Sequence, residues 1–580
     1  MNLLLNQFDI IFDSSESVQE LEALILDMAI RGKLVSQDTS DEPASILLEK
    51  IKKEKEQLIQ EKKIKKEKIL PQIKEEEKPF DLPDGWEWVR LQSLIKKIGA
   101  GSTPRGGKAV YVDKGVKFIR SQNVWNDGLY LNGVAYITEE INNKMSGSIV
   151  KPNDLLLNIT GGSIGRCCIV PSNFDVGNVN QHVSIIRLVD NNDTLRQYLH
   201  CCLISSYIQK TIMSTQVGIS REGLSISKLS GFLIPIPPLN EQKRIVEKLN
   251  QLMCFCDKLK ERLEKKQRRE DKLNLSVFST LEQSQTVEEL KENLQFILSH
   301  LHSLCKNTKH VQQLRNAILS LAVKGKLVTQ DETEEPASVS MERIKKEKEQ
   351  LIQEKKIKKE KPLLQITDEE KSFEVPNGWG WDRLGGLALK VVDGTHHSPQ
   401  SFANGDYLYI TAKNIKNKGV DTSNVTYVLK DVHEEIYSRC NVEKGDILLI
   451  KDGATTGIVT INQLKQDFSL LSSVGLIKTS NDFIDNQYLV YCIRSPFLQG
   501  QIKGMMKGSA ITRITIQKIK NFVIPIPPLG EQKRIVEKVN QLMSLCDELE
   551  SNIEQSRLES ETLMKAVLQE AFTVKEEVIN

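Results

Sequence analysis

Hydrophobic residues follow two different rhythms along the chain. After residues 238 and 528 they recur every three or four positions, which is typical of a coiled-coil helix. Each seam is narrow, so each helix, predicted at about 30–35 residues, needs a partner helix, and the other copy is the obvious one. The predicted seam residues are Ile245, Leu249, Leu252, Leu259 and Leu263 in the first helix and Ile535, Val539, Leu542, Leu549 and Ile553 in the second.

The segments 92–233 and 385–523 have another rhythm. Short apolar or alternating runs such as DLLLNITGG, HVSIIRLV and GDILLIKDG stand between Gly, Asn, Asp and Ser residues. This pattern favours strands and turns, with a few short helices. We therefore predict that each segment folds into a compact domain of mixed helix and sheet.

The sequence outside these segments occurs twice. IPIPPLNEQKRIVEKLNQLM at 234–253 returns as IPIPPLGEQKRIVEKVNQLM at 524–543, and LPDGWEWVRL at 82–91 parallels VPNGWGWDRL at 375–384. The inserts between these motifs are nearly unrelated. The chain is therefore two direct copies of one module with a constant frame and a divergent insert. Constant frames fit a partner bound twice, or each other, whereas divergent inserts fit two different targets; the alternative is a recent duplication whose loops drifted.

The predicted fold class is α+β. Two mixed domains are joined and spaced by two long helices, which form an antiparallel coiled coil in a pseudo-two-fold internal repeat. The predicted domains are an N-terminal helical region at 1–78, a first mixed domain at 79–237, a central helical region at 238–371, a second mixed domain at 372–527 and a C-terminal helix at 528–580.

A lysine-rich segment, IKKEKEQLIQEKKIKKEK, is identical at 51–68 and 344–361. It is polar on nearly every side, which favours a solvated helix or linker. Docking of a partner, or contact with phosphates, is the alternative interpretation.

Composition narrows the class of protein. The formal net charge is only +2, so an electrostatic footprint for nucleic acid must be local. No apolar run is long enough for a membrane span, and the N-terminus lacks the features of a signal peptide. The ten cysteines show neither a disulfide framework nor zinc spacing. We expect a cytoplasmic protein without a membrane partner and without a metal site.

The inserts are rich in side chains that can read the edges of bases. Arg and Lys pair with guanine, Asn and Gln pair with adenine, and all can hold phosphates. The candidate DNA-binding residues in the first insert are Ser102, Thr103, Arg105, Lys108, Arg120, Gln122, Asn123, Asn158, Thr160, Ser163, Gln181, His182, Ser220 and Arg221. Those in the second insert are Thr395, His396, His397, Lys413, Asn414, Lys451, Thr455, Thr456, Thr512 and Arg513.

No catalytic motif stands out in the sequence. It has no [DNS]PP[FYW] stretch of an amino-methyltransferase, no phosphate-binding P-loop and no clear carboxylate–lysine cluster of a nuclease. We therefore predict that the chain itself catalyses nothing.

The repeated motifs resemble a known family. A helix ending in GKLV, then DEPAS, a lysine-rich helix, LPxGW, Ser/Thr–Arg and IPIPPLxEQKRIVEK occur twice, from about residue 18 to 570. This pattern resembles the specificity subunit of type I restriction–modification enzymes. Its most specific elements are Pro235–Leu239 with Glu241 and Gln242, and Pro525–Leu529 with Glu531 and Gln532.

The resemblance implies a non-catalytic DNA-recognition subunit. Each insert would be a target recognition domain that reads one half of a bipartite, asymmetric DNA site, and the coiled coil would set the gap. Two methylation subunits would methylate adenine with S-adenosylmethionine, and restriction subunits would use ATP and Mg²⁺. A single-chain methyltransferase or nuclease, and a coiled-coil scaffold with two protein-binding inserts, are the competing hypotheses.

Overall fold

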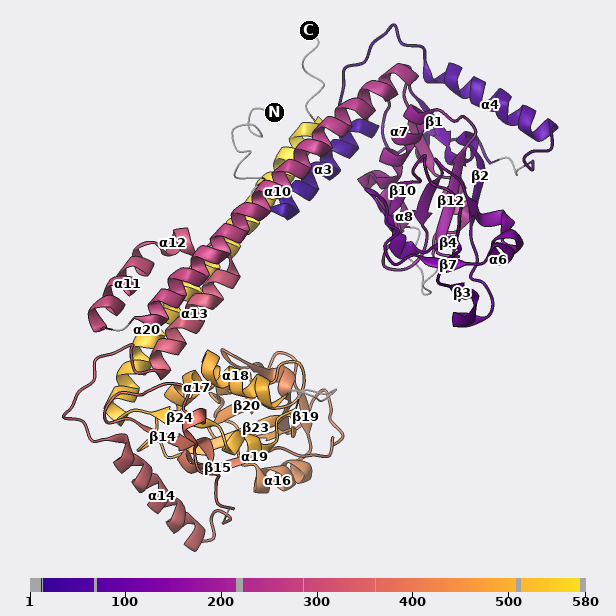
Figure 1. Cartoon of the computed structure of the whole chain (residues 1–580). Helices are drawn as coiled ribbons and strands as arrows, with labels where there is room; N and C mark the ends of the chain where they lie inside the picture. Colours follow the sequence, from indigo (N-terminus) through magenta and orange to yellow (C-terminus); the bar gives the residue numbers. More distant parts are fainter. Residues whose placement is uncertain are drawn as a thin grey trace. The chain divides into compact units, whose positions relative to one another are not determined.

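The computed structural model describes residues 12, 14–66, 70–214, 223–284, 286–359, 361–506 and 513–573. It forms two compact units, one of residues 1–266 with 560–580 and one of residues 267–559 (Figure 1). Helices α10 (Leu239–Gln283) and α20 (Leu529–Thr573) each contribute one end to each unit. No helix in the described ranges is long and apolar enough to cross a lipid bilayer.

The first unit contains a mixed domain after two helices. Its four-stranded antiparallel sheet has the order β10-β9-β12-β2, and a second sheet, β3-β7-β4-β11-β8, contains one parallel pair, β4 with β11. The helices are α3 (Ser15–Ile30), α4 (Ala44–Gln60), α5 (Leu91–Leu94), α6 (Glu139–Lys144), α7 (Asp193–Ile204), α8 (Ser206–Ser214) and α9 (Ile226–Ser230). The strands are β1 (Glu87–Arg90), β2 (Ile95–Ala100), β3 (Tyr111–Val112), β4 (Val116–Ile119), β5 (Val124–Trp125), β6 (Gly128–Leu129), β7 (Ala135–Ile137), β8 (Ile149–Val150), β9 (Leu155–Asn158), β10 (Cys167–Ile169), β11 (Gly177–Val179), β12 (Val183–Leu188) and β13 (Leu233–Ile236).

The second unit repeats this arrangement. Its four-stranded sheet has the order β15-β23-β20-β21, and β16 pairs in parallel with β22. The helices are α11 (Val287–Ser299), α12 (Leu301–Leu304), α13 (Thr308–Val323), α14 (Ala337–Gln353), α15 (Leu384–Leu387), α16 (Lys430–Arg439), α17 (Asn486–Arg494), α18 (Pro496–Met505) and α19 (Ile516–Lys520). The strands are β14 (Gly380–Arg383), β15 (Ala388–Asp393), β16 (Tyr407–Ile410), β17 (Ile415–Lys416), β18 (Gly419–Val420), β19 (Thr426–Val428), β20 (Ile447–Ile450), β21 (Val459–Ile461), β22 (Phe468–Leu470), β23 (Val474–Thr479) and β24 (Val523–Ile526). The prediction of two mixed helix-and-sheet domains is therefore confirmed.

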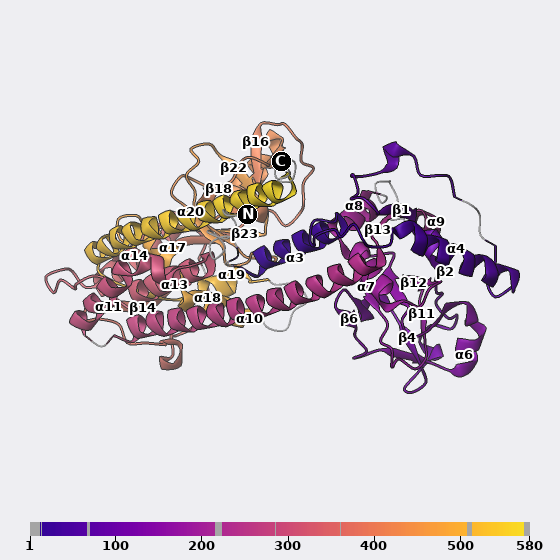
Figure 2. The ribbon, with the colours of Figure 1, turned by 90° about the horizontal axis from the view of Figure 1, so that it is seen from above.

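The predicted seam residues all lie in the cores of the units. Ile245 and Leu249 of α10 are buried with apolar residues of α3, and Met564 near the end of α20 joins the same core. In the second unit, the first part of α20 packs with α13 and with Phe278 and Leu281 at the end of α10. The shorter helices α3 and α13 therefore share a core with each seam, together with the other long helix. Figure 2 shows α3 alongside part of α10.

Two helix lengths differ from the prediction. Helices α10 and α20 have 45 residues each, because good helix formers continue the helix beyond each seam and Phe278 and Leu281 then add new apolar contacts. The lysine-rich helices are shorter than the repeated segment. Helices α4 and α14 end at Gln60 and Gln353, just before Lys62 and Lys355 adopt a left-handed backbone with φ of 56°.

The constant motifs meet at one junction in each unit. In the first unit, the buried Glu241 carboxylate accepts hydrogen bonds from Trp86 Nε1 at 3.0 Å and Gln37 Nε2 at 3.1 Å. Glu531 receives the same bonds from Trp379 at 2.9 Å and Gln330 at 3.0 Å. The repeated GKLVxQ, GW and IPIPPLxEQ motifs therefore recur together because each supplies one residue of the same hydrogen-bonded contact.

The junction also predicts a dependence of stability on pH. Burial raises the pKa of Glu241, and the hydrogen bonds from Gln37 and Trp86 only partly oppose this rise. The native carboxyl thus binds a proton more tightly than the unfolded one, so its contribution to stability increases as the pH falls through the native pKa toward 4.5. A Glu241→Gln variant does not titrate. Its amide NH2 group would face one of the two N–H donors, those of Trp86 and Gln37, and this lost hydrogen bond costs about 1–3 kcal/mol of stability at neutral pH.

We expect the difference in unfolding free energy between the native protein and Glu241→Gln to grow as the pH is lowered from neutral to 4.5. Urea unfolding of the first unit, followed by hydrogen exchange of its amides, measures this difference. Glu531→Gln is the matched variant and should affect only the second unit, because burial raises the pKa of Glu531 in the same way. A difference that shrinks toward acid pH would contradict the raised pKa.

Candidate functional site

In the first mixed domain, four loops meet at one end of the sheets. We call the segments 101–106, 120–123, 159–166 and 180–182 the first loop cluster. Gly101 N–H donates to Asn180 O at 3.2 Å, Ile159 N–H to His182 O at 2.9 Å, and the Asn158 amide to Ser121 O at 2.8 Å. Backbone hydrogen bonds thus fix loops that are distant in sequence into one surface.

The second mixed domain has the corresponding second loop cluster, formed by 394–398, 411–414, 451–457, 471–473 and 513. Ser472 N–H donates to Thr395 O at 2.8 Å, and Lys451 N–H donates to Ser473 O at 2.9 Å. The two clusters share a backbone plan although their sequences differ.

A glycine makes the closest approach in each cluster. A Cβ atom on Gly101 would lie 1.7 Å from Val179 O, and one on Gly394 would lie 1.9 Å from Leu470 O. No side chain fits at either distance, so only glycine allows these loops to cross the neighbouring strand.

Four predicted residues of the first cluster form one polar chain. The Thr103 hydroxyl donates to Gln181 Oε1, and Gln181 Nε2 lies 3.1 Å from His182 Nε2. The Thr160 hydroxyl hydrogen-bonds with Nδ1 of the same imidazole. Gln181 is exposed and His182 is half-buried, so this chain presents donors and acceptors at the surface while its inner end is fixed.

Other predicted residues of the first insert have internal roles. Asn123 is buried, accepts from Arg120 N–H at 3.0 Å and donates to Tyr130 O at 2.9 Å, which closes a turn. Asn158 is also buried and donates to Ser163 Oγ at 3.1 Å. Ser102, Arg105 and Gln122 are exposed, whereas Arg120 is half-buried. The backbone of Lys108 lies in a short 3-10 helix. Ser220 and Arg221 lie outside the described residues.

The second cluster is built around a buried cation. The Lys451 ammonium lies 2.9 Å from Asp452 Oδ2 and 3.5 Å from Asp393 Oδ2. Asp393 Oδ1 also contacts Arg439 Nη2 at 2.8 Å and His396 Nε2 at 3.3 Å. Arg513 Nε lies 3.2 Å from Asp452 Oδ1. Lys451, His396 and Arg513 were predicted as site residues, and the structure brings them together.

Sequence reasoning missed the three other members of this ionic cluster, Asp393, Asp452 and Arg439. The predicted residues are mostly hydrogen-bond donors in Gly- and Asn-rich loops, whereas the two aspartates are acceptors and Arg439 lies at the end of helix α16. The available signal was the position of both aspartates, at the end of the partly buried strand β15 and just after the buried strand β20.

The remaining predicted residues of the second insert are dispersed. Asn414 is buried and closes a turn as Asn123 does, accepting from Thr411 N–H at 3.1 Å. Thr395 Oγ1 donates to His397 O at 3.1 Å, and Thr456 Oγ1 donates to Gly453 O at 2.7 Å. Lys413, His397 and Thr455 are exposed, and Thr512 lies outside the described residues.

One sequence alignment needs correction. Ser220–Arg221 and Thr512–Arg513 look equivalent because both precede Leu/Ile-rich runs. However, Leu224 N–H donates to Ile159 O and Ile514 N–H donates to Lys451 O, both at 2.8 Å. The residue before each donor occupies the same place, so Arg513 corresponds to Gly223.

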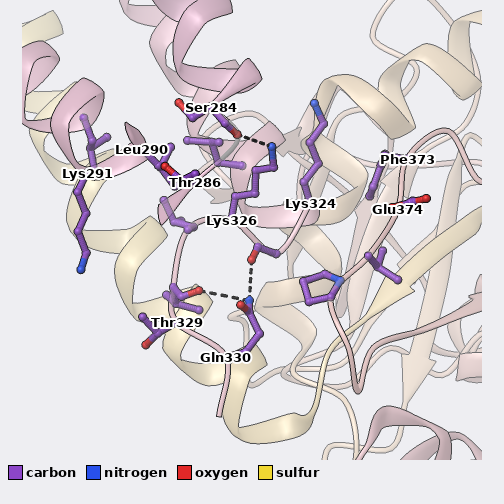
Figure 3. Close-up of a pocket in the computed structure, with 17 residues that line it drawn as sticks. Ser284, Thr286, Leu290, Lys291, Lys324, Lys326, Thr329, Gln330, Phe373 and Glu374 are labelled. Atoms are coloured by element: carbon purple, nitrogen blue, oxygen red, sulfur yellow. Dashed lines mark hydrogen bonds between the residues drawn. The ribbon is translucent and has the colours of Figure 1, made fainter. Parts of the chain in front are cut away.

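A separate cavity of about 670 Å³ lies in the frame of the second unit, between α11, the segment after α13 and residues 373–376 (Figure 3). Two of its three lining lysines contact other protein atoms. Lys326 Nζ donates to Ser284 O at 2.8 Å, and Lys324 Nζ lies 3.9 Å from Glu282. The cavity is thus a feature of the frame and contains none of the loop-cluster residues.

The comparisons with known proteins agree with the duplicated architecture. The family model of the type I restriction modification DNA specificity domain matches residues 83–267 and 378–558, which include both loop clusters. The EcoAI specificity subunit of Escherichia coli is 32% identical over 562 residues, covering 92% of this chain and 90% of the relative. The EcoEI specificity subunit of the same species is 29% identical over 574 residues, covering 93% and 91%.

Among solved structures, a chain from a type I restriction–modification system aligns with a TM-score of 0.49 and 17% identity, covering 85% of this chain and 99% of that one.

Proposed function

This chain belongs to the specificity subunits of type I restriction–modification enzymes, and on that premise we propose that each mixed domain reads one half of a bipartite, asymmetric DNA site. The chain is the DNA-recognition component of its complex and is not itself an enzyme. The proposed target recognition domains are residues 79–237 and 372–527, with helical regions at 1–78, 238–371 and 528–580.

One observation carries this proposal. The two inserts share a sheet order, a parallel strand pair and a loop cluster, but they place different side chains on that common plan. Thr103, Gln181, His182 and Thr160 form the polar chain of the first cluster, whereas the second is built around ionic pairs of Lys451. Two scaffolds with one backbone and different polar groups suit two different short sequences.

The proposed spacer is the pair of long helices, arranged as an antiparallel coiled coil with pseudo-two-fold symmetry. In the first unit the beginning of α10 shares a core with Met564 near the end of α20, and in the second unit the beginning of α20 shares a core with the end of α10. A helix of 45 residues extends about 68 Å. That length exceeds one turn of B-DNA, about 34–36 Å, and is close to two turns.

The proposed partners are double-stranded DNA, two methylation subunits and the restriction subunits of the complex. The methylation subunits would use S-adenosylmethionine to methylate adenine, and the restriction subunits would use ATP and Mg²⁺. We assign none of these cofactors to a residue of this chain. The proposed location is the cytoplasm, where the host DNA lies.

Exchange of residues 92–233 for the first insert of another family member tests the proposal. We expect the map of methylated adenines in cells to show a motif with one half changed and the other half and the gap retained. Exchange of residues 385–523 is the matched control and should change the opposite half. A change in both halves would contradict independent readers, and a complex without sequence-selective DNA binding would favour a protein-binding scaffold.

A further inference from the structure

The two loop clusters have different residues at one shared backbone position, glycine in the first and arginine in the second. In the first cluster, Gly223 lies beside Thr160, and a Cβ atom on Gly223 would lie 2.1 Å from Thr160 Cγ2. In the second cluster, Arg513 takes the place of Gly223 and Asp452 takes the place of Thr160. This position therefore admits a long cationic side chain in the second domain only.

Two contacts fix Arg513 at its base. Its backbone forms an isolated antiparallel bridge with Asp452, and its guanidinium Nε lies 3.2 Å from Asp452 Oδ1. The Arg513 side chain is nevertheless 55% exposed, whereas that of Asp452 is 21% exposed. The carboxylate is thus ion-paired with the side of the guanidinium by distance, although Asp452 Oδ1 accepts no hydrogen bond from the described residues, and the head of the arginine side chain reaches solvent at the loop surface.

Further ionic contacts fix Asp452 itself. Its other carboxylate oxygen contacts the Lys451 ammonium, which is 1% exposed and also faces Asp393. Because the Lys451 side chain is buried and its ammonium lies between two aspartates, the Asp452 carboxylate has little freedom to rotate. The guanidinium is therefore anchored to a rigid base.

We propose that Arg513 reads a guanine in the half-site of the second domain and that Asp452 is its positioning residue; this inference rests on the proposed function. The planar fork of arginine matches O6 and N7 of guanine in the major groove. A side chain held at Nε loses less rotamer freedom on binding and keeps its terminal nitrogens for a bidentate contact. The same fork also pairs with phosphate at two points, so the experiment below is designed to distinguish a base contact from a backbone contact.

The test uses the complete complex with its methylation subunits and a DNA library in which each half-site is randomised in turn. We expect Arg513→Ala to lower the preference for one G·C pair in one half-site by about 5- to 150-fold, the discrimination of one bidentate contact. The preference in the other half-site should not change, and it reports in the same complex that the protein is folded. Asp452→Asn should weaken the same G·C preference to a smaller extent.

Two further variants separate base reading from charge. Arg513→Lys keeps the charge but not the planar fork, so it should lose the guanine preference as Arg513→Ala does. Arg343→Ala is the control, because Arg343 is an exposed arginine of α14 that pairs with Glu335 and lies outside both clusters. It should leave both half-sites unchanged.

Several results would overturn the inference. Equal weakening on all sequences, with a shallower salt dependence and rescue by Arg513→Lys, would identify a phosphate contact. A half-site that keeps its preferences in Arg513→Ala, or that contains no G·C pair, would also overturn it. If the unsubstituted complex recognises no bipartite motif, the proposed function itself fails.

Discussion

Replacement of Lys451 by methionine is expected to destabilise the second mixed domain by about 3–5 kcal/mol, the usual cost of breaking a buried ion pair. The Lys451 side chain is 1% exposed and its ammonium lies between Asp452 and Asp393. Methionine has a similar length but no charge, so two carboxylates would face each other across an apolar side chain. Hydrogen exchange of the amides of β20 and β23 measures the loss, because β20 ends and β23 begins beside this cluster.

Two controls separate the ionic effect from a general effect of losing a lysine. Lys413→Met changes an exposed lysine in the same loop cluster and should alter stability by less than about 0.5 kcal/mol. Adding Asp393→Asn and Asp452→Asn to Lys451→Met should recover much of the loss, since the two carboxylates that had faced the ammonium are then neutral. Equal effects of Lys451→Met and Lys413→Met would show that the buried ion pairs do not stabilise the domain.

Periodicity predicted the existence of both long helices but not their full length. The three- and four-residue spacing gave both long helices, and the repeated motifs gave the duplicated architecture. Their detailed contact was not predictable, because Glu241 meets Gln37 and Trp86 from parts of the chain far away in the sequence. A repeat indicates which motifs belong to one structural unit, but it does not indicate which atoms are in contact.

The candidate site was predicted at the level of loops and less well at the level of side chains. Asn123 and Asn414 have the composition of base-reading residues, yet both are buried and close turns. A short polar side chain hydrogen-bonds either to its own backbone or to a ligand, and local sequence does not distinguish the two. The ionic cluster was missed for a related reason: Asp393 ends β15 and Lys451 follows β20, and only the sheet register brings them together.

Substitution of Gly101 by alanine is expected to destabilise the first mixed domain by about 3 kcal/mol, at the upper end of the usual cost of overpacking. The added Cβ would lie 1.7 Å from Val179 O and 2.9 Å from Asn180 O. Relief requires the backbone to move, which breaks the hydrogen bond from Gly101 N–H to Asn180 O and separates two loops of the first cluster. Urea unfolding of the first domain and the methylation preference of its half-site should therefore change together.

Gly99 provides a matched control two residues earlier in the chain. A Cβ atom there would have no atom within 4 Å outside its chain neighbours, so Gly99→Ala should change stability by no more than about 1 kcal/mol. Gly394→Ala should reproduce the Gly101 defect in the second domain, because its Cβ would lie 1.9 Å from Leu470 O. If Gly101→Ala and Gly99→Ala were equally mild, the loops could separate without cost. The close crossing would then not be what aligns the side chains of the cluster, and the shared backbone plan of the two readers would need another origin.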